Sequence, residues 1–189
     1  MRATLLSRVT IVNRACLLAV VVALSPAVAR HPVPTEHPRL LGTLAELRQL
    51  AVERPDAYAR TVRVARRGEG VDAHSKMISL ALVAAIEEDA GLARQAVDMA
   101  LTYVHGPIRS GHQTFGHDLA RSAFVFDLVH DHWTEAERRA FHDYLNATFD
   151  ANTNSETHVF HNGWYAYKWW GIGLAAYAGY YENPRAPDM

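Results

Sequence analysis

The sequence is poor in cysteine, in basic runs and in long apolar runs. Its single cysteine, Cys16, excludes an intramolecular disulfide. Because Cys16 lies in the N-terminal segment that is expected to be removed, a zinc-thiolate site in the mature chain is excluded as well. The formal net charge is −1, and without a basic stripe the chain does not fit the counterion-release binding that DNA or RNA requires. The apolar run near the N-terminus, Ala15 to Leu24, is shorter than the roughly twenty residues that cross a bilayer. We therefore expect no nucleic-acid partner and, after N-terminal processing, no membrane partner.

Residues 1–29 are typical of a secretory signal peptide. Arg2, Arg8 and Arg14 come first and the apolar run follows. Small residues, Ala27 and Ala29, stand at the two positions that a signal peptidase selects, which predicts cleavage after the second of them. The mature chain is then secreted or periplasmic. The alternative is an uncleaved N-terminal membrane anchor, which requires a longer apolar stretch.

The mature chain is predicted to be all-α, with a proline-rich, extended lead-in at 30–42. Thr43 and Thr134 each precede an acid, Glu46 or Glu137, by three residues, which is the pattern of a capping box. Apolar spacing and breaker residues predict helices at about 43–53, 55–67, 75–88, 90–103, 117–130, 134–150 and 163–181. Gly91 is expected in the turn between the third helix and the fourth. The predicted core faces include Met77, Leu80, Ala81, Ala84, Ala85, Leu119, Ala123 and Phe126.

The arrangement of these helices follows from their connections. No stretch alternates with period two, so we expect no strand. Short loops between successive helices favour antiparallel hairpins. Several of these hairpins recur at similar spacing, which favours a bundle, a solenoid or a toroid.

The segment His158–Leu174 is the richest in chemistry, because Trp and Tyr side chains are concentrated there with two histidines and one lysine. On a helix, residues three and four apart share a face, which predicts that His161, Trp164, Tyr165 and Lys168 line one groove. Aromatic rings cover the apolar faces of sugar rings, while imidazole, amide and ammonium groups bind hydroxyls and carboxylates. The composition therefore favours a sugar site.

Two plainer interpretations of this segment remain open. Large aromatic side chains are usually buried in a core, and the residues concerned are Trp164, Trp169, Trp170 and Tyr177. Asn162 is also a good helix N-cap, a role that can coexist with a site. Gly171 and Gly173 are expected to let another helix pack closely behind the groove.

Several motifs resemble the helical domain of the heparinase II/III-like and alginate lyase group. They are His37-Pro38-Arg39-Leu40-Leu41, Phe126-Asp127-Leu128-Val129-His130-Asp131, Val159-Phe160-His161-Asn162-Gly163-Trp164-Tyr165, Gly171-Ile172-Gly173-Leu174-Ala175-Ala176 and Glu182-Asn183-Pro184. The resemblance covers most of the mature chain. It implies that residues 43–189 form part of an incomplete (α/α) toroid. In longer relatives a β-sandwich follows, so we expect this chain to be truncated at its C-terminus.

The same resemblance implies β-elimination on a uronate-containing acidic polysaccharide, with no cofactor. Asn162 and His161 are expected to neutralise the uronate carboxylate, because fixed donors must hold the charge that develops as the C5 proton leaves. Tyr165 and Tyr167 are further candidates for the proton transfers, since nearby cations such as Lys168 favour a phenolate. The order His161-Asn162 reverses the Asn-His order that is common in the alginate lyase branch.

Substrate-binding residues are expected from the aromatic segment and from the loop His105–His117. They are Trp164, Lys168, Trp169, Arg109, His112 and Gln113. The histidines of this loop lack the helical i, i+4 spacing of a zinc protease, so no metal site is expected. Four further polar residues are close together in the sequence and are interpreted as surface residues at the end of a helix. They are Asp127, His130, Asp131 and His132.

Other functions remain as alternatives. A uronate C5 epimerase shares the proton abstraction. A glycoside hydrolase needs two carboxylates across the glycosidic bond, and the stretch from His158 to Tyr181 contains no acid. A secreted, non-catalytic helical module that binds glycan is the remaining alternative.

Overall fold

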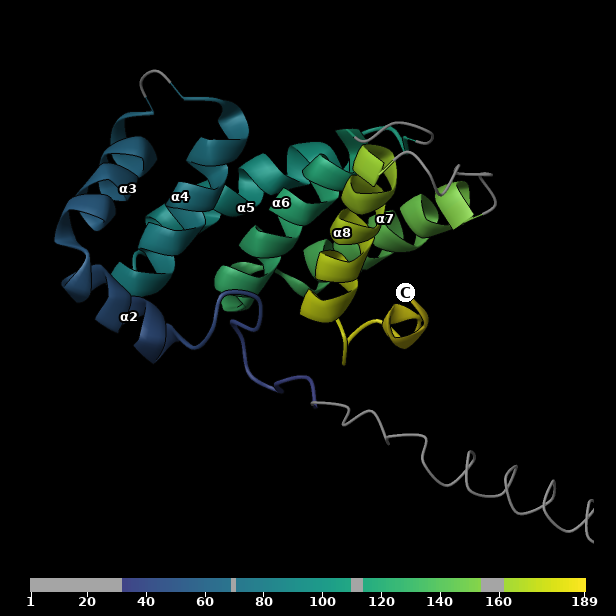
Figure 1. Ribbon diagram of the computed structural model, residues 1–189, viewed down its shortest axis with the longest axis horizontal. Coiled ribbons are helices and arrows are strands. Elements are labelled where there is room, and N and C mark those ends of the chain that lie inside the picture. Colours follow the sequence, from purple (N-terminus) through teal and green to yellow (C-terminus); the bar gives the residue numbers. More distant parts are fainter. Residues whose placement is uncertain (1–31, 69–70, 110–113, 154–161) are drawn as a thin grey trace, which may run out of the picture. The chain divides into compact units, whose positions relative to one another are not determined.

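The computed structural model describes residues 32–68, 71–109, 114–153 and 162–189, and for 114–115, 153 and 162–169 only the backbone. Within these ranges the chain forms seven α-helices and no strand, which confirms the all-α prediction (Figure 1). The predicted signal segment, 1–29, lies outside the described residues. No described helix is long and apolar enough to cross a lipid bilayer.

The helices follow the predicted order. Their bounds are α2 Leu44–Glu53, α3 Pro55–Arg67, α4 Ala73–Glu87, α5 Ala90–Val104, α6 Thr114–Leu128, α7 Glu135–Thr153 and α8 Asn162–Ala178. Two short 3₁₀ turns, η1 His130–His132 and η2 Ala186–Asp188, follow α6 and α8. The last helix is shorter than predicted, because the chain turns away after Ala178 instead of continuing to Tyr181.

Local chemistry explains most helix ends. Thr43 and Glu46 form the predicted capping box at the start of α2. Gly68 ends α3 with φ 65°, a left-handed conformation that glycine adopts without strain. The turn between α4 and α5 differs from the prediction: the left-handed residue is Glu88, with φ 58°, and Gly91 lies inside the first turn of α5.

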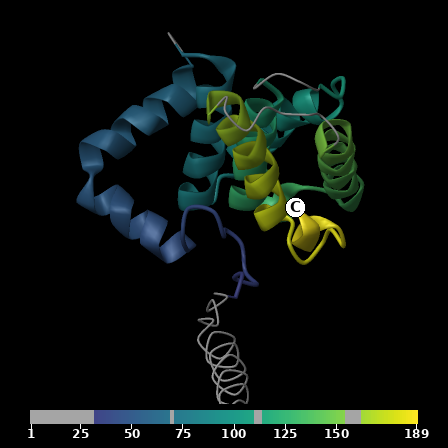
Figure 2. The same ribbon diagram turned by 45° about the vertical axis from the view of Figure 1, so that its right-hand side comes forward.

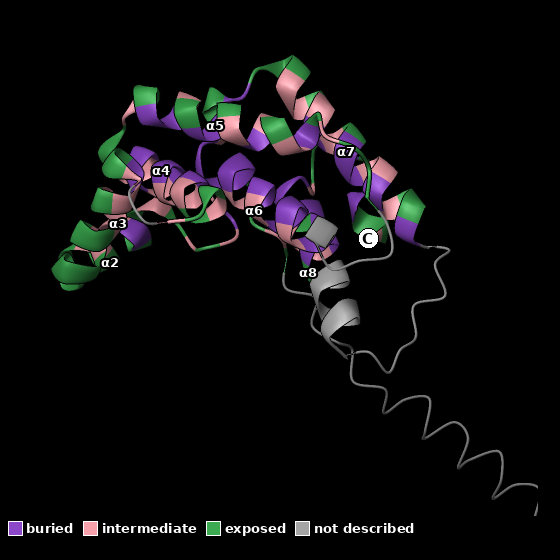
Figure 3. Cartoon of the chain, turned by 90° about the horizontal axis from the view of Figure 1, so that it is seen from above, coloured by how far each residue is buried: buried purple, intermediate pink, exposed green. Residues whose placement is uncertain are grey.

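The core lies where α4, α5 and α6 meet α7 and α8, and Figure 3 shows the buried faces of these helices turned inward. All but one of the predicted core residues are buried, and Ala85 is only half-buried. Phe126 is fully buried and stacks on Phe141, with ring centroids 4.3 Å apart. Its ring also meets Trp133 edge-on at 5.4 Å. These aromatic contacts connect α6, η1 and α7.

Residues 33–189 group as one unit, and its first segment, Val33–Gly42, contains no helix. Two backbone amides of this segment, those of Arg39 and Leu40, donate to the buried carboxylate of Asp127 in α6 at 2.7–2.9 Å. The Arg39 guanidinium donates to the carbonyl of Ala178 at the end of α8. Figure 2 shows the segment, in dark blue, passing beside that end of α8. The extended lead-in is therefore tied to the ends of two helices.

Candidate functional site

The aromatic segment enters the structure as the first half of α8, which begins at Asn162. The backbone of this helix carries most of the residues predicted for catalysis and substrate binding, namely Asn162, Trp164, Tyr165, Tyr167, Lys168 and Trp169. Their side chains, and His161 altogether, lie outside the described residues. Further along, Trp170 and Tyr177 are exposed, so their interpretation as core residues is wrong.

A backbone contact between α6 and α8 fixes where this half-helix lies. A side chain at Gly171 would place its Cβ 2.3 Å from the carbonyl oxygen of Gly116, so the two helices touch directly. The prediction of close packing is confirmed for Gly171 and is wrong for Gly173, whose Cβ position has no described atom within 4 Å. At the same contact, the rings of His117 and Trp170 meet edge-on with centroids 6.1 Å apart. The first half of α8 therefore lies at the end where α6 begins.

A buried carboxylate, Asp118, organises the polar side chains at this end. Its Oδ1 atom lies 3.0 Å from Nε2 of His74, and its Oδ2 atom lies 3.4 Å from Nη1 of Arg109. His74 belongs to the first turn of α4, where its backbone amide donates to the N-cap residue Asp72. The cap of α4 thus sets the position of the imidazole that meets Asp118.

The hydrogen bonds of His74 select one tautomer. A guanidinium only donates, so Nδ1 of His74 must accept the 2.8 Å hydrogen bond from Nη1 of Arg121. Nε2 then carries the hydrogen and donates to Asp118. The ring stacks on Tyr103 of α5, with centroids 4.9 Å apart. Residues from α4, α5 and α6 are thereby joined in one network, which we call the Asp118 cluster: His74, Tyr103, Arg109, Asp118 and Arg121.

The surroundings of this cluster lower the pKa of one histidine, His117, and raise the pKa of one tyrosine, Tyr103. Burial and the nearby Arg121 charge lower the pKa of His117 below its ordinary value of 6.5. Burial, followed by the charge of Asp118, raises the pKa of Tyr103 above 10.0. At neutral pH the imidazole is therefore a proton acceptor, and the phenol keeps its proton.

The structure brings only part of the second predicted segment to this region. Arg109 is exposed beside Asp118, and its carbonyl accepts a 3.1 Å hydrogen bond from Asn152 near the end of α7. His112 and Gln113 lie outside the described residues. Sequence reasoning missed His74 and Arg121, because their partners lie 44 and 47 positions away along the chain. The only local signal was a histidine in the first turn of a helix, two residues after the strong N-cap Asp72.

A second polar cluster lies at the other end of α6, formed by His37, Asp127, His130 and Glu182. Nδ1 of His37 lies 2.7 Å from Asp127, and its Nε2 lies 3.2 Å from Oε1 of Glu182. Nε2 of His130 lies 2.9 Å from the other oxygen of Glu182. The interpretation of this group as surface residues is correct for the exposed Asp131 and His132 and wrong for Asp127, which is 1% exposed. The interpretation fails for Asp127 because residues of the lead-in, which are distant in sequence, pack over its carboxylate.

The ionisable groups of this second cluster stabilise each other's charged forms. Burial acts to raise the pKa of Glu182, but the imidazoles of His130, His142 and His37 outweigh it, and the pKa falls well below 4.5. Burial acts to lower the pKa of His37, but its hydrogen bonds with Asp127 and Glu182 raise it above 6.5. Ligand atoms of His37, His130 and Glu182 all lie within 4.8 Å of one another, a spacing that a metal ion can bridge.

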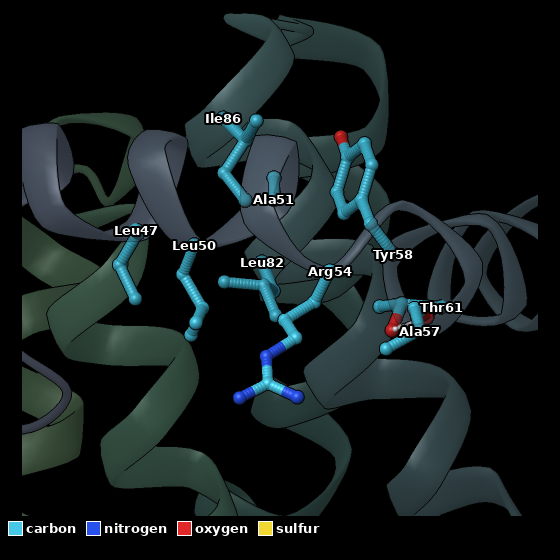
Figure 4. Close-up of a pocket in the computed structure, with 9 residues that line it drawn as sticks. All are labelled: Leu47, Leu50, Ala51, Arg54, Ala57, Tyr58, Thr61, Leu82 and Ile86. Carbon is cyan, nitrogen blue, oxygen red and sulfur yellow. Dashed lines mark hydrogen bonds between the residues drawn. The ribbon is translucent and has the colours of Figure 1, made fainter.

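An apolar pocket between α2, α3 and α4 is a third candidate (Figure 4). Figure 4 shows Leu47 and Leu50 of α2 facing Leu82 and Ile86 of α4, with the Arg54 guanidinium at one side. Its volume of about 180 Å³ is below the roughly 300 Å³ of the smallest usual ligand sites. Its lining residues include no two side chains that could act as a general acid and a general base, so we assign it no catalytic role.

No known protein family, curated protein or solved structure matches the chain.

Proposed function

We propose that the chain is an exported polysaccharide lyase that acts on a uronate-containing acidic polysaccharide by β-elimination, with its hairpins forming part of an incomplete (α/α) toroid. The observation that carries the proposal is the backbone contact of Gly171 with Gly116. Through it, the first half of α8 lies at the same end of the helices as Arg109 and His117. Residues from two separately predicted segments thus belong to one region.

The reaction places defined demands on this region. A base takes the C5 proton, the C–H electrons form the C4–C5 double bond, the C4–O bond breaks, and the departing oxygen receives a proton. The developing charge must be held by fixed donors, a role that we assign to Asn162 and His161. Arg109 supplies a cation at the edge of the region, where a guanidinium binds a carboxylate in a bidentate manner.

The proton carriers fall into two groups. His117 is an acceptor, because its lowered pKa leaves a neutral imidazole at pH 7. Tyr103 is a donor, because its raised pKa keeps the phenol protonated. Tyr165 and Tyr167, on α8, are the alternative carriers that the family resemblance implies. In the first assignment, the acceptor His117 and the donor Tyr103 have opposite pKa shifts, as acid–base pairs in active sites do.

Among the alternatives, a uronate C5 epimerase needs the same proton abstraction and returns a proton to the opposite face. A hydrolase is disfavoured, because the buried acid Asp118 is held by His74 and Arg109, and among the described side chains none of its hydrogen-bond or ion-pair partners is a carboxylate. A non-catalytic glycan-binding module would use the same cations without changing the polymer.

The test is to incubate the purified protein with alginate, heparan sulfate, chondroitin sulfate and hyaluronan, and to follow the ultraviolet absorbance of the unsaturated uronate. We expect a rise with one of these polymers. Asn162→Ala should lower kcat by about 10²- to 10³-fold, as removal of one charge-stabilising donor does. Arg109→Ala should mainly raise KM, and Arg63→Ala, an exposed arginine of α3, should change neither.

The outcomes separate the alternatives. No rise with any of the four polymers contradicts elimination. Inversion at C5, detected by NMR of the recovered polymer, identifies an epimerase instead. Binding that leaves the polymer unchanged identifies a module without catalysis.

A further inference from the structure

We propose that His37, His130 and Glu182 form a binding site for one divalent transition-metal ion with the ligand preferences of zinc. Two imidazole Nε2 atoms face the two oxygens of one carboxylate, at 3.2 Å and 2.9 Å. A tetrahedral ion with bonds of about 2.0–2.1 Å separates its ligand atoms by roughly 3.3 Å. The two nitrogen–oxygen distances are thus close to those between ligands of one ion, and all three ligand atoms lie within 4.8 Å of one another.

The outer contacts of the cluster are those of a metal-binding histidine. Metal-bound imidazoles commonly donate their other N–H to a carboxylate, which fixes the ring and its tautomer. Nδ1 of His37 meets Asp127 in this way at 2.7 Å. The carboxylate of Asp127 is in turn held by the backbone amides of Arg39 and Leu40. His130 stacks on His37, with centroids 4.0 Å apart and planes 8° from parallel. Because an imidazole binds a metal in the plane of its ring, one of the two rings must turn out of this stack when the ion binds.

A fourth ligand is available from α7. Nε2 of His142 lies 3.9 Å from Oε2 of Glu182, which is too long for a hydrogen bond. Both ring nitrogens of His142 are buried and have no hydrogen-bond partner among the described residues. Burying an unpaired polar atom is costly, and coordination would remove that cost for the nitrogen that binds the ion. Gly179 makes room for the ring, since a Cβ there would lie 2.6 Å from Cε1 of His142.

The donor set selects the class of ion. Imidazole nitrogens with one carboxylate suit zinc and its neighbours in the transition series, whereas calcium and magnesium take oxygen ligands. In the metal-free protein, the proton on Nε2 of His37 is shared with Glu182. The incoming ion displaces that proton to solvent, and the hydrogen on Nε2 of His130 likewise leaves to solvent or moves to Nδ1 of the same ring. The Nδ1 hydrogen of His37 stays on its ring and keeps its hydrogen bond to Asp127. No electron transfer is involved.

The ion would act as a clamp on the fold. Its ligands come from the lead-in, from η1 after α6 and from the turns after α8, which are joined by no covalent link other than the chain itself. The site is independent of the proposed lyase function. Asp127 and Asp118 are nine residues apart on α6, so the two clusters are separated by roughly 13 Å along the helix.

The experiment is a calorimetric titration of the full chain, produced without a histidine tag, with zinc chloride. We expect one ion per chain and a higher Tm in its presence, since an ion that binds only the folded state stabilises it. His130→Ala and Glu182→Gln should each weaken binding at least about tenfold, because even outer-shell changes cost that much. The matched control is His132→Ala, an exposed histidine of the same 3₁₀ turn, and it should bind as the wild type does.

A second measurement on the wild type avoids any variant that fails to fold. Bound cobalt(II) should show the intense visible bands of a four-coordinate nitrogen and oxygen site. The proposal is overturned if cobalt keeps the weak spectrum of its hydrated ion, if zinc does not bind, or if His130→Ala and His132→Ala bind equally well. Zinc binding without lyase activity, or lyase activity without zinc binding, decides the two proposals separately.

Discussion

Gly171 of α8 and Gly116 of α6 touch backbone to backbone, and a Cβ on Gly171 would lie 2.3 Å from the Gly116 oxygen. Gly171→Ala should therefore force the helices apart and lower the free energy of unfolding by about 1–3 kcal/mol, as overpacking does. Urea unfolding measures this change. Gly173→Ala is the matched control. It has space for a methyl group among the described atoms, and alanine is favoured in helices by up to about 1 kcal/mol, so the two substitutions should have opposite signs.

The start of α7 should make stability depend on pH through Glu137. Burial acts to raise the pKa of Glu137, but hydrogen bonds from Arg94 and Thr134 outweigh it, and the pKa falls below 4.5. A depressed folded-state pKa stabilises the protein above the unfolded value and loses that contribution as pH falls through the folded value. Glu137→Gln should cost about 1 kcal/mol at pH 7, the usual worth of a cap, and less below pH 4.5.

Denaturant unfolding between about pH 3 and pH 7 measures this difference, because that range brackets the ordinary pKa of a glutamate carboxyl. The control is Glu135→Gln, an exposed acid in the same helical turn. A gap between Glu137→Gln and the wild type that stays constant with pH would contradict the role of the carboxylate.

The anchor of the lead-in should depend on Asp127. Its buried carboxylate accepts hydrogen bonds from two backbone amides and from His37. In the presence of a chelator, Asp127→Asn should lower the free energy of unfolding by about 1–3 kcal/mol and speed proteolysis within residues 33–41. Asp131→Asn, on an exposed acid nearby, should stay within about 0.5 kcal/mol of the wild type. Equal cleavage rates for the two variants would rule out the anchor.

The charge of Arg121 should be visible in the titration of His117. After burial, that guanidinium is the largest influence that lowers the imidazole pKa. Arg121→Gln should therefore move the pKa of His117 up toward 6.5, which NMR of the imidazole carbons detects. Arg138→Gln, on an arginine of α7 near the other end of α6, should leave the titration unchanged. A downward shift in Arg121→Gln would contradict the electrostatic origin.

The sequence predicted the helices well because their signals are local. The capping box of Thr43 and Glu46 depends on residues three positions apart, and the core face of α6 repeats within one helix. The break between α4 and α5 lies where it was predicted, but Gly91 is not part of it. Left-handed backbone is typical of glycine, whereas the structure uses Glu88 at this turn.

The sites were harder to predict, because their contacts join distant segments. From the sequence, Asp127 is expected to be an exposed acid at a helix end, whereas in the structure residues 37–40 cover it. His74 likewise meets Asp118 across 44 positions, which no periodicity reports. By contrast, the close approach at Gly171 was predictable, since small residues on one helix face indicate close packing whatever the partner is.

The anchoring of Arg39 has a consequence for how the chain folds. Its backbone amide donates to Asp127, 88 positions away, and its guanidinium donates to Ala178, 139 positions away, as well as to the nearby Thr35. Closing loops of that length is repaid only after the helices that hold the partners have formed. Attachment of residues 33–41 is therefore expected as the final folding event, and a fluorophore placed there would report completion of the native state rather than its nucleation.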